Sequence, residues 1–413
     1  MKAIKNIFFN FFLGLSLKIL IKFLNKLVRS SGFILESHNN ELHNIGKNTD
    51  KNSLRLVIKR KSLYFKLILC PGLYFGEAYV KGDVIISNGN LSDFLKIILS
   101  NVGKNDYVFC ENIFIKTLYA FKNFLRKNNI MNSKNNVAHH YDISDNLYKL
   151  FLDSKMQYSC AYFKDSNESL EKAQLNKIKH IIKKLDINKN CSILDIGSGW
   201  GGLSIEIARE TGAKVCGITL SENQLKYSKY KAKLEGLDHL ITFKLSDYRD
   251  INDKYDRIVS VGMFEHVGKD YYNMFFNKIN SLLLEDGFAL IHTIGSLTPP
   301  KPVEPWINKY IFPGGYIPTI SEISPIIEKS KLVLCDLEIW RTHYAKTLSK
   351  WKNNFLSHRE EVITMFNEEF VRMWEYYLTS CQYSFVYNNS VVFQILLSKN
   401  LTSVPITRDY IYK

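Results

Sequence analysis

The sequence predicts an α/β fold built on a mostly parallel sheet, with a smaller N-terminal α+β domain. Two observations carry this prediction. From residue 170 onward, apolar runs of strand length alternate with helical patterns, which is typical of parallel sheets with helices on both faces. The first of these strands also runs directly into the glycine-rich turn Gly197-Ser-Gly-Trp-Gly-Gly202, and a helical pattern follows the turn.

The chain before the sheet divides into three parts. Residues 1–53 form a basic amphipathic segment, residues 54–127 an N-terminal domain, and residues 128–136 a polar, aperiodic linker. Residues 137–413 then form the α/β domain. Alternating apolar residues and the turn glycines Gly72, Gly76 and Gly82 predict short strands within residues 54–86, and residues 91–100 predict a helix.

The α/β domain should begin with a helix and continue through five strands. Six of the nine prolines fall between residues 299 and 318, so we expect neither a regular helix nor a central strand there. The expected elements are helix 170–185, strand 191–196, helix 202–211, strand 214–219, helix 221–235, strand 241–245, strand 256–261, helix 270–284 and strand 287–294.

The basic segment carries an amphipathic pattern. On a helix, Lys18, Lys22, Lys26 and Arg29 share one face and apolar residues fill the other. This pattern is typical of a helix lying in a membrane interface. A helix packed on its own domain fits equally well. The apolar residues 6–17 are too few to span a bilayer.

Positive charge is concentrated before residue 135. Residues 1–134 hold 21 Lys and Arg against 8 Asp and Glu, whereas residues 135–413 hold 34 against 32. The two parts should therefore meet different partners. Anionic membrane and nucleic acid are the usual partners of such a surface, and a solvated basic face is the third interpretation.

The cysteines argue against two classes of protein. There are seven, and none forms a C-x-x-C pair. This pattern predicts neither a disulfide framework nor a zinc site, and we expect no metal. A reducing, cytoplasmic setting fits best.

The glycine-rich turn indicates a polar, nucleotide-like cofactor. Its glycines let a ligand approach the backbone, and the following helix offers unpaired N–H groups. Gly197, Gly199 and Gly202 match the dinucleotide fingerprint, but the next strand lacks the acid that NAD requires and ends on hydroxyl residues. Asp195 instead gives Asp-x-Gly-x-Gly, which resembles motif I of class I S-adenosylmethionine (SAM) methyltransferases.

Longer motifs make the resemblance more specific. Five segments, together with Gly76–Asp83, resemble the cyclopropane-fatty-acyl-phospholipid synthase family and occur in its order, and the resemblance covers residues 54–400. It implies a class I SAM-methyltransferase, Rossmann-like catalytic domain in residues 137–413 and a lipid- or membrane-binding domain in residues 54–127. The segments are His140–Tyr148, Met156–Phe163, Tyr255–Gly268, Leu290–Gly295 and Pro305–Gly314.

The resemblance also implies the reaction. A methyl group passes from SAM to an alkene carbon of a phospholipid acyl chain, a proton leaves the new methyl group, and the ring closes. The implied base is a bicarbonate ion surrounded by Cys160, Glu265, His292 and Tyr344, and bicarbonate follows from the resemblance alone. Taken singly, His292 also fits a core histidine and Cys160 a small buried hydrophobe, whereas Glu265 in its apolar surroundings requires a partner.

The resemblance assigns the cofactor residues as well. Tyr248 follows strand 241–245, where its ring can stack on adenine, and Asp247 can receive the adenine amino group. Ser198 stands where relatives often have cysteine. The implied SAM residues are Tyr158, Ser159, Gly197, Gly199, Thr219, Leu220, Gln224, Asp247 and Tyr248.

Partner and location follow from the same interpretation. We expect a cytoplasmic enzyme bound peripherally to the inner face of the cytoplasmic membrane, on an anionic phospholipid bilayer and without nucleic acid. A homodimer is a hypothesis from the family. The open alternatives are a related lipid methyltransferase that adds a methyl branch, a basic nucleic-acid methyltransferase, and a membrane-binding protein without activity. The basic part lacks a zinc ribbon or an RNP-like aromatic motif.

Overall fold

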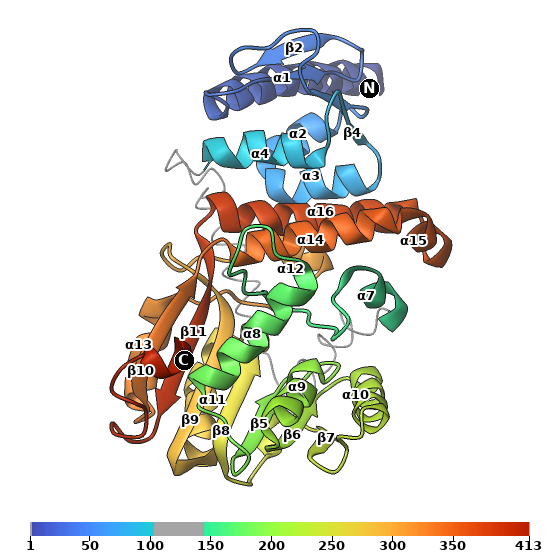
Figure 1. Ribbon diagram of the computed structural model, residues 1–413. Helices are drawn as coiled ribbons and strands as arrows, with labels where there is room; N and C mark the ends of the chain where they lie inside the picture. The colour runs from blue at the N-terminus through green and yellow to red at the C-terminus, as the bar shows by residue number, and fades with distance from the viewer. Residues whose placement is uncertain (1, 103–143, 413) are drawn as a thin grey trace. The chain divides into compact units, whose positions relative to one another are not determined.

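The computed structural model describes residues 2–102 and 144–412, with side chains from residue 15 onward (Figure 1). Contacts divide the chain into two compact units. Unit 1 takes its described residues from 1–125, 304–311 and 355–388, and unit 2 takes the rest. The expected linker 128–136 and the start of the His140 motif lie outside the described residues. The domain boundaries therefore stay predictions.

Unit 1 contains a four-stranded sheet of order β2-β1-β3-β4, in which only β1 and β3 pair in parallel. Two later parts of the chain belong to this unit, which the sequence did not lead us to expect. Its elements are α1 (Lys2–Leu27), β1 (Phe33–Glu36), β2 (Leu42–Ile45), β3 (Arg55–Ile58), α2 (Leu63–Leu69), α3 (Pro71–Val80), β4 (Val84–Ser87), α4 (Leu91–Val102), α12 (Pro305–Tyr310), α15 (Arg359–Met365) and α16 (Glu368–Tyr387).

The prediction of strands throughout residues 54–86 was wrong in its middle part. Residues 63–80 form α2 and α3, and only β3 and β4 are strands. The apolar run that begins at Leu63 buries Leu63, Tyr64 and Leu67, which is helical spacing. Gly76 lies within α3, where a Cβ atom would come 2.6 Å from the ring of Trp306. This glycine therefore permits close packing and makes no turn.

The proline-rich segment also differs from expectation. Residues 305–310 form the short helix α12, with Pro305 in its first turn. Proline is tolerated there because the first N–H groups of a helix have no partner within it. Glu304 caps the helix and accepts from the backbone N–H groups of Trp306 and Ile307, each at 3.0 Å.

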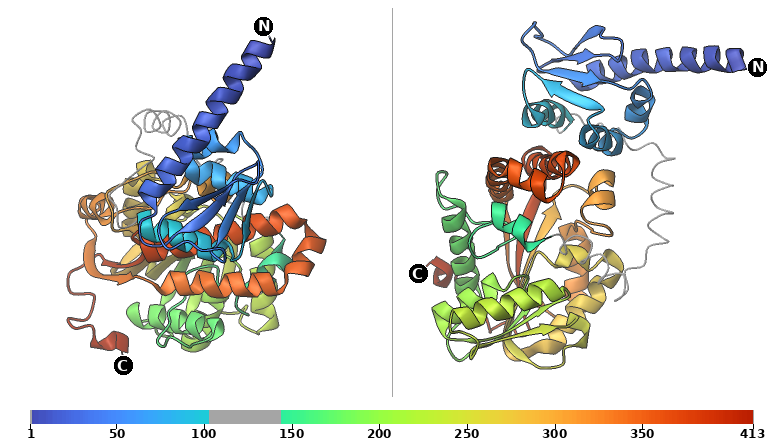
Figure 2. Two further views of the ribbon diagram at one scale, coloured as in Figure 1. Left: turned by 90° about the horizontal axis from the view of Figure 1, so that it is seen from above. Right: turned by 90° about the vertical axis from the view of Figure 1, so that its right-hand side faces the viewer.

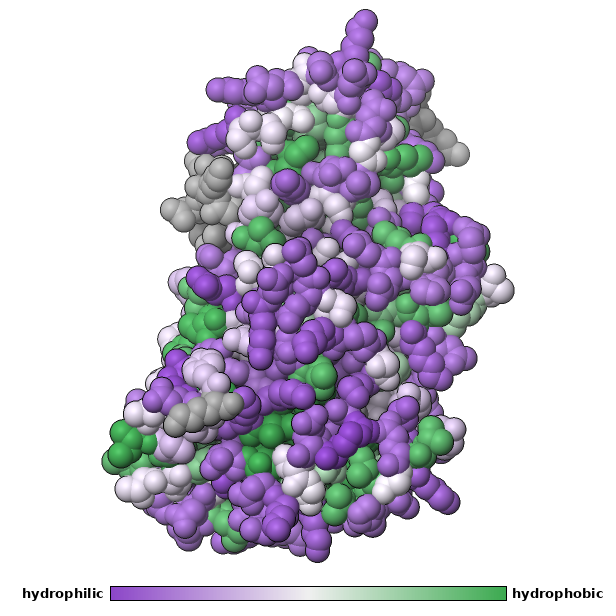
Figure 3. Space-filling view, viewed as in Figure 1, coloured by the Kyte–Doolittle hydropathy of each residue, from purple (hydrophilic) through white to green (hydrophobic). Residues whose placement is uncertain are grey.

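Helix α1 packs against other elements of unit 1 and also exposes apolar residues. Leu20 and Val28 are buried, whereas Leu15 and Ile19 are exposed. The helix contacts α2 and β2. Among the described residues, no helix is long and apolar enough to cross a bilayer. On the face seen in Figure 3, hydrophilic residues predominate and hydrophobic ones gather in small areas among them.

Unit 2 contains the predicted α/β sheet, and the strands and helices expected between residues 170 and 294 are confirmed within a few residues. Its elements are α7 (Asp145–Phe151), α8 (Leu170–Lys184), β5 (Ser192–Ile196), α9 (Gly202–Thr211), β6 (Lys214–Thr219), α10 (Glu222–Leu234), β7 (Ile241–Leu245), η1 (Tyr248–Asp250), β8 (Tyr255–Val261), η2 (Phe264–His266), η3 (Lys269–Tyr271), α11 (Tyr272–Leu282), β9 (Leu283–Ser296), α13 (Ile320–Lys329), β10 (Val333–Trp340), α14 (His343–Ser357), β11 (Ser390–Ser398) and α17 (Asp409–Tyr412).

The seven strands are ordered β10-β11-β9-β8-β5-β6-β7. The five strands from β9 to β7 are parallel, and β11 runs antiparallel to both β9 and β10. The order turns back beside β5, since β6 lies on one side of it and β8 on the other. Ligands of open α/β sheets bind outside the carboxyl ends of the strands at such a point.

Helices cover both faces of this sheet (Figure 2). Apolar residues of α8, α9 and α10 pack with one face, including Ile178, Leu203 and Ala232. Residues of α11 and α13 pack with the other, including Phe275 and Ile323. Adjacent residues of each strand point to opposite faces, so a side chain of β9 or β11 points either toward the face that α8, α9 and α10 cover or toward the face of α11 and α13.

Candidate active site

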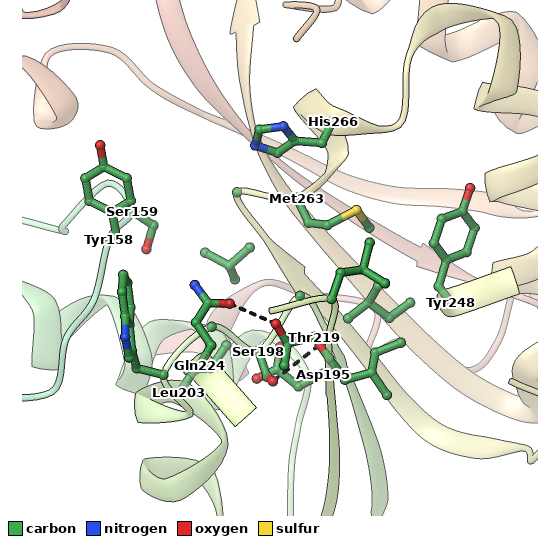
Figure 4. A pocket seen from close by; sticks show the side chains of 18 of the residues that line it. Tyr158, Ser159, Asp195, Ser198, Leu203, Thr219, Gln224, Tyr248, Met263 and His266 are labelled. Carbon is green, nitrogen blue, oxygen red and sulfur yellow. Dashed lines mark hydrogen bonds between the residues drawn. The ribbon is translucent and has the colours of Figure 1, made fainter. Parts of the chain in front are cut away.

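A pocket of about 150 Å³ lies at the carboxyl ends of β5, β6 and β8. Figure 4 shows Tyr158 and Tyr248 on opposite sides of it, with Met263 and His266 on the wall across from Thr219. All nine residues predicted to bind SAM line this pocket. They are Tyr158, Ser159, Gly197, Gly199, Thr219, Leu220, Gln224, Asp247 and Tyr248.

The glycine loop forms the floor of the pocket. Gly197 and Gly199 have φ angles of 82° and 55°, a region that side chains disfavour. A Cβ atom on Gly199 would meet nothing within 4 Å, so this glycine faces open space. Beneath the loop, the buried carboxylate of Asp195 accepts from Ser204 Oγ at 2.7 Å, which ties β5 to α9. Burial raises the pKa of Asp195 to about 6.

Two polar side chains at the end of β6 hold each other. Thr219 Oγ1 donates to Gln224 Oε1 at 2.8 Å, as the dashed line in Figure 4 shows. This bond leaves the Gln224 amide N–H group available toward the pocket. Ser198 also lines the pocket, and its hydroxyl donates to the carbonyl of Ile218 at 3.3 Å.

The two predicted adenine residues follow β7. The carboxylate of Asp247 pairs with the Arg249 guanidinium through two bonds, of 2.8 and 2.7 Å. Tyr248 is buried against the edge of Phe275, with ring centroids 5.3 Å apart, and burial raises its pKa to about 12. Because Asp247 is already paired with Arg249, only the remaining lone pairs of its carboxylate can accept a hydrogen bond from a ligand.

The opposite wall comes from the loop after α7. The ring of Tyr158 stacks on Trp351 of α14 at a centroid distance of 5.0 Å. The Ser159 hydroxyl accepts from Lys177 Nζ at 2.8 Å. Gln174 of α8 donates to the backbone carbonyl of Ser159 at 3.0 Å. Through these two bonds, helix α8 holds Ser159 and its part of the wall in place.

Glu265 lies in η2, directly after the end of β8. Its Oε1 accepts from the backbone N–H of Ile294 at 2.6 Å. Its Oε2 is shielded from solvent and has no hydrogen-bond partner among the residues that the structure describes. Burial outweighs the effect of the bond from Ile294 and raises the pKa of Glu265 to about 7.

His292 lies on β9, directly opposite Val261 of β8. Its Nδ1 is 3.1 Å from Gln394 Nε2, and its Nε2 is buried without a partner within the described part of the chain. Burial, with the nearby ammonium groups of Lys177 and Lys184, holds the pKa of His292 well below its usual range. The imidazole is therefore neutral.

Cys160 and Tyr344 come from two segments that are bonded together. Cys160 is fully buried, and burial raises the pKa of its thiol. The next residue, Ala161, donates its N–H to Thr347 Oγ1 of α14 at 3.0 Å. Tyr344 is half-buried one turn earlier on α14, with its ring edge-on to Trp351 at 5.9 Å.

The four candidate catalytic residues thus fall into two groups beside the pocket, and none lines it. Glu265 and His292 both lie near the end of β8, because Glu265 bonds Ile294 of β9 and the N–H of Gly262 bonds the carbonyl of His292 at 2.9 Å. Cys160 directly follows the pocket residue Ser159. Among the described residues, no group of His, Cys, Asp and Glu is arranged to hold a metal ion.

Comparison with known proteins decides the family. A family model described as "Mycolic acid cyclopropane synthetase" matches residues 128–395, which is more than half of the chain. The chain belongs to this family.

Individual relatives of this cyclopropane synthetase family member agree. It is 42% identical over 262 residues to "Cyclopropane-fatty-acyl-phospholipid synthase" of Escherichia coli K12, covering 63% of this chain and 67% of the relative. It is 31% identical over 351 residues to "Tuberculostearic acid methyltransferase" of Mycobacterium tuberculosis, covering 81% of each.

A solved structure shows the same fold. The cyclopropane synthase MmaA2 from Mycobacterium tuberculosis is 34% identical, with a TM-score of 0.62 over 64% of this chain and 98% of that one. These findings confirm the predicted class I fold, the family resemblance and the prediction of a SAM-dependent methyltransferase.

The sequence interpretation of this family member missed several residues of the site. Met263 and His266 belong to the same motif as Glu265 and line the pocket. Burial lowers the pKa of His266 to about 4, so it is neutral there. Lys177 and Lys184 are fully buried on α8. Two lysines seven residues apart, on the apolar face of a predicted helix, were the available indication.

Proposed function

We propose that this chain transfers the methyl group of SAM to a double-bond carbon of an unsaturated phospholipid acyl chain and then closes a cyclopropane ring. The family and its members support the reaction class. The structural observation that carries the proposal is the pair of partnerless buried atoms, Glu265 Oε2 and His292 Nε2. The two residues lie near the end of β8, close to the pocket residues Val261 and Gly262.

The pocket is the proposed SAM site. The open backbone at Gly199 and the N-terminus of α9 offer N–H donors to the cofactor carboxylate. Tyr248 presents an aromatic face for adenine, and Asp247 offers a remaining carboxylate lone pair to its amino group. Ser198 is as small as the cysteine that relatives often carry there, so we expect no loss of binding.

The partnerless atoms fit a bicarbonate ion, which we propose as the base. Bicarbonate offers oxygen acceptors to a donor on His292 and a hydroxyl or an acceptor to Glu265. Two buried ammonium groups, on Lys177 and Lys184, act electrostatically on His292 and favour an anion there. When bound, bicarbonate supplies the acceptor for the proton lost before ring closure.

The side chains around this position keep it dry and ordered. The raised pKa of Glu265 leaves its carboxyl group largely protonated below pH 7, able to donate to an anion. The raised pKa of Cys160 keeps a neutral thiol. We assign Glu265 and His292 to holding the base, and Cys160 and Tyr344 to closing the site. A water-poor site prevents capture of the cationic intermediate.

Unit 1 is the proposed membrane-binding part. Helices α1 and α2 pack together and expose Ile19, Phe65 and Leu69. Lys18 and Lys66 lie on the same two helices. Exposed apolar side chains beside ammonium groups fit an anionic bilayer, where the former enter the interface and the latter meet phosphate. Peripheral binding on the cytoplasmic membrane and a homodimer stay predictions.

A methyl branch is the second candidate product, because a relative whose match covers 81% of this chain is named for tuberculostearic acid. The test is expression in a bacterium that lacks its own cyclopropane synthase, with proton NMR of its phospholipid fatty acids. We expect the upfield signals of a cyclopropane methylene group. Methyl-branched or exomethylene chains instead would establish the second candidate, and unchanged lipids would refute both. Gly199→Val protein, which should not bind SAM, serves as the inactive control.

A further inference from the structure

Three residues on neighbouring strands stand directly opposite one another beneath α8. Glu338 of β10 is opposite Gln394 of β11, and Gln394 is opposite His292 of β9. Lys184 of α8 reaches into this row. Its Nζ lies 2.6 Å from Glu338 Oε2 and 3.3 Å from Gln394 Oε1. On its other side, Gln394 Nε2 lies 3.1 Å from His292 Nδ1.

The chemistry of these groups fixes every hydrogen in the row. An ammonium group can only donate, so the atom of Gln394 that faces Lys184 must be its oxygen. The NH₂ group of Gln394 therefore faces His292 and donates. Nδ1 must then accept, and the proton of the neutral imidazole must sit on Nε2. The argument holds without seeing hydrogens, because the lysine removes the ambiguity of the amide.

The row is buried at Gln394 and His292 and is anchored by charge at its partly exposed end, Glu338. Lys184 and Gln394 are fully buried, and His292 is 2% exposed. Asp336 and Glu338 both pair with Lys184, at 3.3 and 2.6 Å.

Both carboxylates have a second cationic or donor partner. Glu338 also bonds His180 Nε2 at 2.8 Å, and Asp336 also pairs with Arg408 at 3.3 Å. Against the opposing effect of burial, His180 and Lys184 hold the pKa of Glu338 far below its usual range. The Lys184 ammonium group, which orients Gln394, is therefore held in place by Asp336 and Glu338.

We propose that Gln394, oriented by Lys184, is a positioning residue that fixes His292 in the Nε2-protonated tautomer. The catalytic consequence rests on the proposed function. The Nε2–H group, which has no partner in the described chain, becomes a fixed donor toward the proposed anion. It also excludes His292 Nε2 as the proton acceptor, so the reaction must use a base other than this histidine.

The first test reads out the wild-type protein and uses a variant only for assignment. Full-length protein labelled with ¹⁵N at histidine is examined by long-range ¹H–¹⁵N correlation NMR, and the His292 ring signals are assigned by their absence from His292→Gln protein. We expect a protonated Nε2 and an unprotonated Nδ1. A proton on Nδ1 in the wild-type protein would overturn the proposal.

The second test replaces the donor by an acceptor of the same shape. In Gln394→Glu, the new carboxylate can only accept from His292, so we expect the proton on Nδ1. We also expect kcat to fall on the order of 10–100-fold, the range typical when the partner that orients a functional histidine is changed. The KM for SAM should stay the same, because His292 does not line the pocket.

The controls separate this proposal from the proposed function. Gln382→Glu makes the same change at a half-buried residue of α16 in unit 1 and should alter neither the tautomer nor kcat. If Gln394→Glu moves the proton but leaves kcat unchanged, the positioning role stands and the catalytic role of His292 fails. If Nε2 stays protonated and Nδ1 unprotonated in Gln394→Glu, the positioning role is refuted.

Discussion

Lys177 Nζ donates to Ser159 Oγ at 2.8 Å inside the protein, where the lysine has no exposure to solvent. The same ammonium group donates to Gln157 Oε1 at 2.6 Å. Burial lowers the pKa of Lys177 to about 8, against the opposing effects of Asp153 and Asp195. A costly buried charge thus holds the loop that forms one wall of the pocket.

Replacing this lysine should therefore weaken cofactor binding. Lys177→Met keeps the length of the side chain but leaves Gln157 and Ser159 without their donor. Hydrogen bonds to charged groups contribute about 1.5–3 kcal/mol, so we expect SAM affinity to fall about 10–100-fold by calorimetry. Lys179→Met, on the exposed side of the same helix, is the control. Equal affinity in both variants would contradict the role of Lys177.

Gly199→Val should abolish SAM binding in a folded protein, because its side chain would project into the open space that the cofactor requires. A non-glycine residue at this φ of 55° also costs about 1–2 kcal/mol. Gly236→Val is a matched control, since Gly236 has a φ of 68° and open surroundings but does not line the pocket. Both variants should lose similar thermal stability. Loss of SAM affinity in both would point to misfolding instead.

Glu265→Gln should lower the rate of product formation by about 10²–10⁴, because it removes a group that holds the proton acceptor. SAM affinity should survive, since Glu265 lies outside the pocket. If methyl transfer continues while deprotonation slows, methylated or hydroxylated chains should appear in place of the ring. Normal turnover to the usual cyclopropane product would refute this role. Glu304→Gln, which makes the same change at a carboxyl group of unit 1, is the control.

Glu265 should also make stability depend on pH. Its folded-state pKa of about 7 lies above the ordinary value of 4.5, so the folded protein binds this proton more tightly than the unfolded chain. The resulting stabilisation is complete below pH 4.5 and is lost as the pH rises to 7, by up to about 3 kcal/mol. Urea unfolding of wild-type and Glu265→Gln protein at both ends of this window measures it. The difference between the two proteins should shift against the wild type as the pH rises.

Membrane binding should depend on the exposed apolar residues of α2. The double variant Phe65→Ser, Leu69→Ser should bind vesicles of anionic phospholipid at least about tenfold more weakly, because both side chains are about half exposed and would enter the interface. Tyr230→Ser, Leu234→Ser is the control on α10.

Salt provides a second measurement for the same surface. Flotation of wild-type protein should fall as salt rises above about 0.1 M, where charges are screened within roughly 10 Å. Equal flotation of both double variants would refute this surface. Tight binding of RNA in place of vesicles would favour the nucleic-acid alternative.

The sequence could predict what local pattern determines. The alternation of strands and helices predicted β5 to β9, and the family motifs predicted nine of the residues that line the pocket. It could not predict β10 and β11, because each pairs antiparallel with a strand far away in the sequence, β10 with β11 and β11 with β9. For the same reason it missed Gln394, which acquires its role only when β11 is placed beside His292. Residues 63–69 were misread because a short apolar run fits both periodicities.

Helix α8 bears on how enzymes of this kind can be recombined. Gln174 and Lys177 hold the cofactor loop, and seven residues after Lys177 the same helix supplies Lys184, which orients Gln394. One helix therefore influences both the affinity for the cofactor and the tautomer of His292. A chimera joined between α8 and β5 would take this helix from one parent and the sheet from the other. A chimera joined before α7 would take both from the same parent. Homologue shuffling should retain activity only with the second kind of junction.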